Sequence, residues 1–164
     1  MGNTSNLPQI STVEVQSKLN NPEILFVDVR GASELSAGKL DAKKFLNIPH
    51  TGLLFNIKSA IIFQEITNEF NRPDDDFKKQ YKLEKPQKNA EIVIYCQRGR
   101  RGSIAQNALA ELGYENVLNW ENGYSSLWIF INKFLFISSI TNLLTRKKQR
   151  YSKIILIKLL FPVF

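Results

Sequence analysis

The stretch Glu91-Ile-Val-Ile-Tyr-Cys96-Gln-Arg-Gly-Arg-Arg101-Gly-Ser103 decides the fold, because it predicts a strand, a tight loop and the start of a helix. Its first part, Ile92 to Tyr95, is a short apolar run that is typical of a buried strand. The run ends at Cys96, the only cysteine of the chain. Apolar residues then recur at helical spacing from Ser103 to Leu112, and Gly113 is expected to end that helix.

This order of elements predicts that Cys96 lies at the carboxyl end of a strand, where ligands bind in open α/β sheets. A tight loop that leads into a helix turns backbone N–H groups inward, and the helix N-terminus adds about half a positive charge. Arg98, Arg100 and Arg101 add full charges nearby. We therefore expect the thiol to lose its proton more easily than a free thiol and to attack an anionic substrate. Gly99 is expected where the loop turns too tightly for a Cβ.

The loop Cys96-Gln97-Arg98-Gly99-Arg100-Arg101-Gly102 resembles the active-site loop of single-domain rhodaneses, most of all the thiosulfate:glutathione sulfurtransferase branch. Three further stretches resemble the family's landmarks in the right order: Leu25 to Arg30, Asn47 to Pro49, and the segment from Gly113 to Trp128. The resemblance covers about residues 8–128, taken here as the domain. It implies a rhodanese-like α/β fold, with a parallel sheet of about five strands and helices on both faces.

The resemblance also implies a two-step sulfur transfer. The Cys96 thiolate would take the sulfane sulfur of a donor such as thiosulfate, which leaves as sulfite. An acceptor thiol, glutathione or a thioredoxin-like protein, would then remove that sulfur from the Cys96 persulfide. The expected substrate-binding residues are Gln97, Arg98, Gly99, Arg100 and Arg101, and the expected supporting residues are Asp28, Arg30 and Gly102.

Charged residues near the second predicted strand are interpreted as structural. Asp28 interrupts the apolar run Ile24 to Val29, and we expect its carboxylate to accept hydrogen bonds from nearby backbone N–H groups. Arg30 and Glu34 are spaced for an ion pair across one helical turn. His50 is a lone loop histidine, and no catalytic base role is expected for it.

Three other interpretations of the Cys96 loop stay open. The plainest is an inert buried cysteine beside solvated arginines, which requires a thiol, a glycine turn and three cations to coincide without a function. A non-catalytic rhodanese module that binds a protein partner would have no need of Cys96 and the cationic loop. A phosphatase or arsenate reductase also has a Cys–Arg loop before a helix. Such phosphatases need five residues between the two, whereas four separate Cys96 from Arg101, and a helix starting near Ser103 would fix that length.

The net charge of +7 belongs to the end of the chain. Residues 1–128 hold fifteen residues of each sign, and residues 129–164 hold seven basic residues and no acidic one. A basic chain often binds nucleic acid, but no such partner is expected because the charge does not follow a domain face. One cysteine and one histidine exclude an internal disulfide and the common zinc sites, so no metal or cofactor is expected. A working free thiol suits a reducing compartment, and we predict a cytoplasmic location.

Further elements are predicted from periodicity and turn residues. They are a short strand at Ile10, a helix from Ser11 or Thr12 to Leu19, strands at Ile24–Val29, Lys43–Ile48 and Asn116–Trp120, and helices at Glu65–Phe70 and from Pro73 to Tyr81. The strand at Lys43–Ile48 is expected near the sheet edge. Residues 51–64 depart from the family, because an apolar segment precedes the expected helix there.

Residues 129–164 form a tail of different composition, in which two blocks rich in Ile, Leu and Phe flank the basic run Arg146 to Arg150. Neither block has the roughly 20 apolar residues of a membrane span. The tail could be a membrane-surface anchor. Alternatively, the tail, and residues 51–64 with it, could come from an imperfect gene model, since both are rich in Ile, Phe, Lys and Asn. We favour the second interpretation for the tail and do not expect membrane contact.

Overall fold

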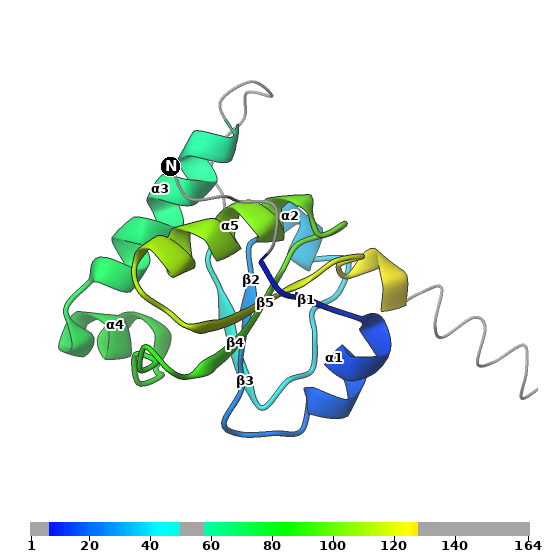
Figure 1. Ribbon diagram of the computed structural model, residues 1–164, viewed down its shortest axis with the longest axis horizontal. Coiled ribbons are helices and arrows are strands. Elements are labelled where there is room, and N and C mark those ends of the chain that lie inside the picture. The colour runs from blue at the N-terminus through cyan, green and yellow to red at the C-terminus, as the bar shows by residue number, and fades with distance from the viewer. Residues whose placement is uncertain (1–6, 50–57, 128–164) are drawn as a thin grey trace, which may run out of the picture. The chain divides into compact units, whose positions relative to one another are not determined.

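The computed structural model describes residues 7–49 and 58–127, which form a five-stranded parallel sheet flanked by helices (Figure 1). The elements are β1 (Gln9–Ile10), α1 (Thr12–Lys18), β2 (Leu25–Asp28), α2 (Ala32–Leu35), β3 (Lys44–Asn47), α3 (Lys58–Asn71), α4 (Asp74–Tyr81), β4 (Glu91–Tyr95), α5 (Arg100–Glu111) and β5 (Asn116–Trp120). The chain divides after Leu127, so the described residues all lie in its first unit. Within them, no helix combines the length and the apolar character needed to cross a membrane.

The strand order β1-β5-β4-β2-β3 puts β4 at the centre and β3 at an edge, as predicted for β3. Ile92 of β4 is paired with Leu25 of β2 on one side and with Val117 of β5 on the other. Because all these strands are parallel, the carboxyl ends of β2, β4 and β5 meet at the same edge of the sheet. The loops that leave these three strands therefore converge there.

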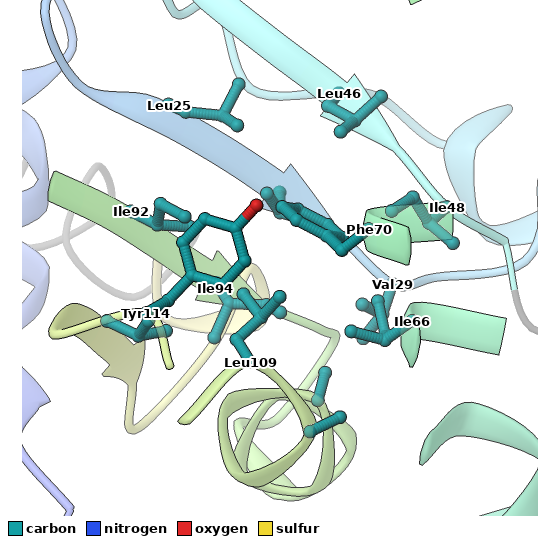
Figure 2. Packing of buried hydrophobic residues seen from close by; sticks show 14 of the residues in the cluster. Leu25, Val29, Leu46, Ile48, Ile66, Phe70, Ile92, Ile94, Leu109 and Tyr114 are labelled. Carbon is teal, nitrogen blue, oxygen red and sulfur yellow. The ribbon is translucent and has the colours of Figure 1, made fainter. Parts of the chain in front are cut away.

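Two apolar layers cover the two faces of the sheet, which explains why the central strands are almost continuously apolar. Figure 2 shows one layer, in which Ile92 and Ile94 of β4 face Phe70 of α3 and Leu109 of α5. Tyr95 of the same strand faces the opposite way and packs with a second cluster that includes residues of α1 and β1. Helices therefore lie on both faces, as expected for this fold.

Helix α3 begins earlier than the sequence pattern predicted. The expected helix was Glu65–Phe70, whereas α3 runs from Lys58 to Asn71. Ile62, Ile66 and Phe70 recur at intervals of four residues, and each is only 1% exposed in the core beneath the helix. Residues 58–64 thus have a place in the domain, contrary to the idea that they are foreign to it, while residues 50–57 lie outside the described ones.

Local sequence signals set the ends of two other helices. Ser11 caps α1 and forms a capping box with Glu14, as expected for a helix that starts there. Gly113 follows the C-cap of α5 with φ at +81°. The Tyr114 N–H donates to the Leu109 carbonyl over 3.0 Å, which completes a glycine-ended cap. The predicted stop at Gly113 is confirmed.

Candidate active site

Cys96 is the first residue after β4, at the sheet edge where the carboxyl ends of the strands meet. The sheet pairing continues up to it, because the Val29 N–H donates a 2.9 Å hydrogen bond to the Tyr95 carbonyl. Cys96 is only 1% exposed and lies at the end of the apolar layer that includes Val29. It is a free thiol. The strand and the loop therefore leave this thiol little open surface.

Helix α5 begins one turn before the predicted start near Ser103, since its first helical residue is Arg100. Its first backbone bond runs from the Ser103 N–H to the Gly99 carbonyl over 2.9 Å. The prediction was wrong because the first turn carries no apolar residue that would reveal a helical period. Arg100 and Arg101 are thus helical, and the loop after Cys96 shrinks to three residues.

The start of α5 supplies backbone donors near Cys96. The amides of Arg98, Gly99, Arg100 and Gly102 donate to no backbone carbonyl in the described part of the chain. The first amides of any helix lack an intrahelical acceptor, and the helix dipole adds positive potential at the same end. This arrangement favours an anion in front of the loop.

Gly99 is required where the loop meets the turn that follows β5. Its φ is +80°, and a Cβ there would lie 1.9 Å from the carbonyl oxygen of Glu121. The expected need for glycine is therefore confirmed by both the conformation and the close approach. Gly102 is required for a different reason, because a Cβ there would lie 2.3 Å from Oδ1 of Asn119 on β5. These two glycines let the loop and the first turn of α5 press against β5 and the turn after it.

The turn after β5 also holds the backbone of the cysteine itself. The Tyr124 N–H donates to the Cys96 carbonyl over 2.9 Å, and the Ser125 N–H donates to the Gln97 carbonyl over 3.0 Å. Gly123 has φ at +57°, and a Cβ there would lie 2.3 Å from the Cys96 oxygen. Gly123 and Tyr124 belong to the segment from Gly113 to Trp128 that resembles a family landmark, but the sequence gave no sign that they contact the loop.

Asp28 and Arg30 form a fully buried ion pair at the end of β2. Arg30 Nε donates to both carboxylate oxygens over 3.0 and 3.1 Å, and Nη2 donates to Oδ2 over 2.8 Å. The Arg30 N–H also donates to Asp28 Oδ1, which confirms the predicted backbone role of this carboxylate. Burial by itself would lower the pKa of Arg30, but the hydrogen bonds and charge of Asp28 outweigh it and raise that pKa.

Arg30 links this ion pair to the loop. Its Nη1 donates to Oε1 of Gln97 over 3.4 Å, and its Nη2 donates to the Gly38 carbonyl over 2.9 Å. Its guanidinium carbon lies 3.9 Å from the centre of the Tyr124 ring. Arg30 thus contacts both the loop and the turn that supports it, whereas the predicted ion pair with Glu34 is wrong.

Glu34 instead pairs with Arg101. Arg101 Nη1 donates to Oε2 and Nη2 donates to Oε1, each over 2.6 Å, so the pair is bidentate. The hydrogen bonds to Glu34 are the largest cause that raises the pKa of Arg101, burial opposes them, and charge attraction and a hydrogen bond with Cys96 raise it further. The Arg101 guanidinium is therefore paired with Glu34 and lies near Cys96, the residue that follows β4.

The other two arginines of the loop differ from Arg101. Arg98 and Arg100 are exposed, and neither side chain has an ion pair or hydrogen bond with the described residues. Their charges can therefore meet a dissolved anion. His50 lies outside the described residues. Across residues 7–49 and 58–127, no group of three His, Cys, Asp or Glu side chains could hold a metal ion.

Comparison with known proteins assigns the chain to one family. The profile of the rhodanese-like domain matches residues 11–128. The chain is 30% identical over 118 residues to the human thiosulfate:glutathione sulfurtransferase, covering 71% of this chain and 90% of that one. It is 28% identical over 116 residues to the Saccharomyces cerevisiae thiosulfate:glutathione sulfurtransferase, covering 70% and 73%. It spans only 61% of the length of a Schizosaccharomyces pombe relative that is 28% identical over 105 residues.

Solved structures agree with this match. A human single-domain sulfurtransferase superposes with a TM-score of 0.60 at 27% identity, over 75% of this chain and 96% of that one. The five-stranded sheet and its flanking helices are therefore those of a known fold. Relatives named as sulfurtransferases are thus similar to this chain both in sequence and in fold.

Proposed function

Because the chain belongs to the family of rhodanese-like domains, we propose that it is a thiosulfate sulfurtransferase that carries a sulfane sulfur on Cys96. One observation supports this most: a free thiol lies at the carboxyl end of β4, beside Arg101 and before the N-terminus of α5. A nucleophilic sulfur in a cationic, donor-rich loop suits attack on a small anion.

The reaction needs no external oxidant or reductant. The Cys96 thiolate attacks the outer sulfur of thiosulfate, the new S–S bond forms, and the old S–S bond breaks with its electron pair leaving on sulfite. Cys96 then carries a persulfide. The thiolate of an acceptor attacks the outer sulfur of that persulfide, which returns the Cys96 thiolate and releases the acceptor persulfide.

The loop supplies charge to both steps. The amides of Arg98, Gly99 and Arg100, which donate to no backbone carbonyl among the described residues, would stabilise the persulfide anion together with the positive end of α5. The exposed guanidinium groups of Arg98 and Arg100 attract the doubly charged donor.

Glutathione is the proposed acceptor, since two relatives are named for it. A thioredoxin-like protein is the alternative acceptor, and no organic cofactor is needed for either. A reducing compartment such as the cytoplasm would keep the acceptor thiol available. The name of the Schizosaccharomyces pombe relative describes that protein as mitochondrial, so an organelle with reduced glutathione is the competing location.

A phosphatase is the rival enzyme. Three loop residues separate Cys96 from the helix, and Arg101 is already in the first turn of α5. Such a loop is short for the oxygens of a tetrahedral phosphate but has room for one sulfur atom. A binding module without catalysis is the other rival, and it gives no reason for a cationic side chain beside the Cys96 sulfur.

Mass spectrometry of the intact protein tests the proposal. Treatment of the full chain with thiosulfate should add one sulfur, about 32 Da, and glutathione should remove it. The Cys96→Ser variant, treated in the same way, should gain no mass. Wild-type protein that never gains sulfur while it hydrolyses aryl phosphates would contradict the proposal.

A further inference from the structure

We propose that Glu34 is a positioning residue of this site, which holds the Arg101 guanidinium beside the Cys96 sulfur and so reserves that arginine for the sulfur rather than for the donor anion. The inference rests on the proposed function. Glu34 has no expected contact with the substrate, and it acts only through Arg101.

The carboxylate of Glu34 is itself fixed in place. Its Oε2 accepts hydrogen bonds from the Gly31 N–H over 3.2 Å and from Arg101 Nη1 over 2.6 Å. Gly31 directly follows Arg30, whose side chain is locked in the buried pair with Asp28. The position of the Arg101 guanidinium is therefore defined by the end of β2 and not only by helix α5.

The bidentate geometry sets the orientation of the guanidinium as well as its place. Two parallel hydrogen bonds of 2.6 Å fix the plane of the Arg101 guanidinium. A lysine ammonium in its place could not form this planar, bidentate contact. Both side chains are largely covered, with 20% exposure for Arg101 and 31% for Glu34. Solvent therefore competes less with this pair than with a pair on the open surface.

The Glu34–Arg101 pair also gives different roles to the three arginines Arg98, Arg100 and Arg101. The charge of Arg101 is balanced by Glu34, so its long-range attraction for a donor anion is small, while it remains a short-range donor to sulfur. Arg98 and Arg100 are exposed and have no ionic partner in the described part of the chain. Capture of the donor thus falls to them.

A double-mutant cycle on the full chain tests whether Glu34 acts through Arg101. The reporter is the rate at which Cys96 reacts with neutral iodoacetamide at one fixed pH, together with kcat and KM for thiosulfate. We expect Glu34→Ala to slow alkylation and lower kcat by about tenfold, because a misplaced catalytic group costs at least that much. In the Arg101→Ala background, Glu34→Ala should change either rate by less than about twofold.

Glu69→Ala is the matched control, because Glu69 near the end of α3 and Arg72 just after it also form a bidentate pair, with bonds of 2.8 and 2.7 Å. It should leave both rates near wild type. Arg101→Lys should restore only part of the kcat lost in Arg101→Ala. Melting temperatures show whether each variant is folded, and Glu34→Gln replaces the alanine variant if that one is not.

Four results would overturn the inference: equal effects of Glu34→Ala in both backgrounds, no effect of it in the wild-type background, an equal loss in Glu69→Ala, or full activity of Arg101→Lys. Alkylation needs only the thiol, so the cycle can be read even in a protein that forms no persulfide. Failure of the proposed function and failure of this inference are therefore distinguishable.

Discussion

The amide of Tyr124 donates a 2.9 Å hydrogen bond to the carbonyl of Cys96, and this bond ties the proposed nucleophile to a turn that is 28 residues further along the chain. The Tyr124 ring also lies against the buried Arg30 guanidinium. One residue therefore joins the cysteine loop to the end of β2. The geometry of the site depends on this turn as much as on β4 and α5.

Gly123→Ala is expected to impair both stability and activity. Its positive φ disfavours an L side chain, and its Cβ would lie 2.3 Å from the Cys96 oxygen. Backbone strain of this kind costs about 1–3 kcal/mol. The loop must also shift, so kcat/KM for thiosulfate should fall by at least roughly tenfold. Thermal unfolding and steady-state kinetics measure the two effects.

Gly113→Ala is the matched control for that variant. Gly113 has a positive φ too, but a Cβ there would have no neighbour within 4 Å. It should lose stability to a similar strain, about 1 kcal/mol, and keep its kcat/KM. Equal losses of activity in both variants would mean that strain alone, rather than the contact with Cys96, explains the effect.

Arg98→Ala and Arg100→Ala should each raise the KM for thiosulfate, because both guanidinium groups are exposed beside the loop. We expect a rise of roughly threefold at low salt, and a smaller one as added salt screens the charges. Kinetics over a series of salt concentrations measure it. Lys79→Ala removes the same charge from the exposed face of α4 and serves as the control. A KM that does not change in either arginine variant would contradict their role in donor capture.

Insertion of one glycine between Arg98 and Gly99 should weaken persulfide formation by at least roughly a hundredfold, since the loop is held at both ends. Gly99 is packed against Glu121, and Cys96 is bonded to Tyr124, so an added residue has to bulge outward. Intact-mass measurement after thiosulfate treatment reports the loss. The wild-type protein should not hydrolyse p-nitrophenyl phosphate, and clear hydrolysis would favour the phosphatase alternative.

A chain that stops after Trp128 should fold and keep sulfurtransferase activity, because residues 1–128 carry every landmark of the site and equal numbers of acidic and basic residues. It should also be more soluble than the full chain, which ends in apolar blocks. Circular dichroism, activity and solubility of the two proteins are the measurements. Unfolding of the shorter chain would place residues after 128 in the core and move the domain boundary.

Much of the fold could be predicted because its signals are local. The apolar run before Cys96, the capping residue Ser11 and the stop at Gly113 each act within a few residues of the chain. The start of α5 could not be predicted, because its first turn, Arg100 to Ser103, contains no apolar residue. Helix propensity does not predict such a turn. The helix start depends instead on the close packing of Gly99 against Glu121.

The sequence indicated which residues form the candidate site, but it did not indicate their contacts. The loop sequence pointed to Cys96 and its arginines, yet Glu34 lies 67 residues before Arg101 and was assigned to Arg30 by spacing alone. That assignment failed because the Arg30 guanidinium is fully buried and paired with Asp28, so it does not pair with Glu34. Local spacing of three or four residues cannot reveal an ion-pair partner that only tertiary packing brings close.

The 1% exposure of Cys96 has a consequence for the order in which reactants can reach it. Because Cys96 is buried, we expect a small ion to reach its sulfur more easily than a bulky disulfide or a folded partner does. Addition of one sulfur extends the side chain by about 2 Å, the length of an S–S bond. If Cys96 takes up a sulfur as proposed, we expect the outer sulfur to stand nearer to solvent and to be open to a larger thiol. Under the proposed function, the burial of Cys96 would therefore favour a small donor in the first step and admit a larger acceptor only in the second.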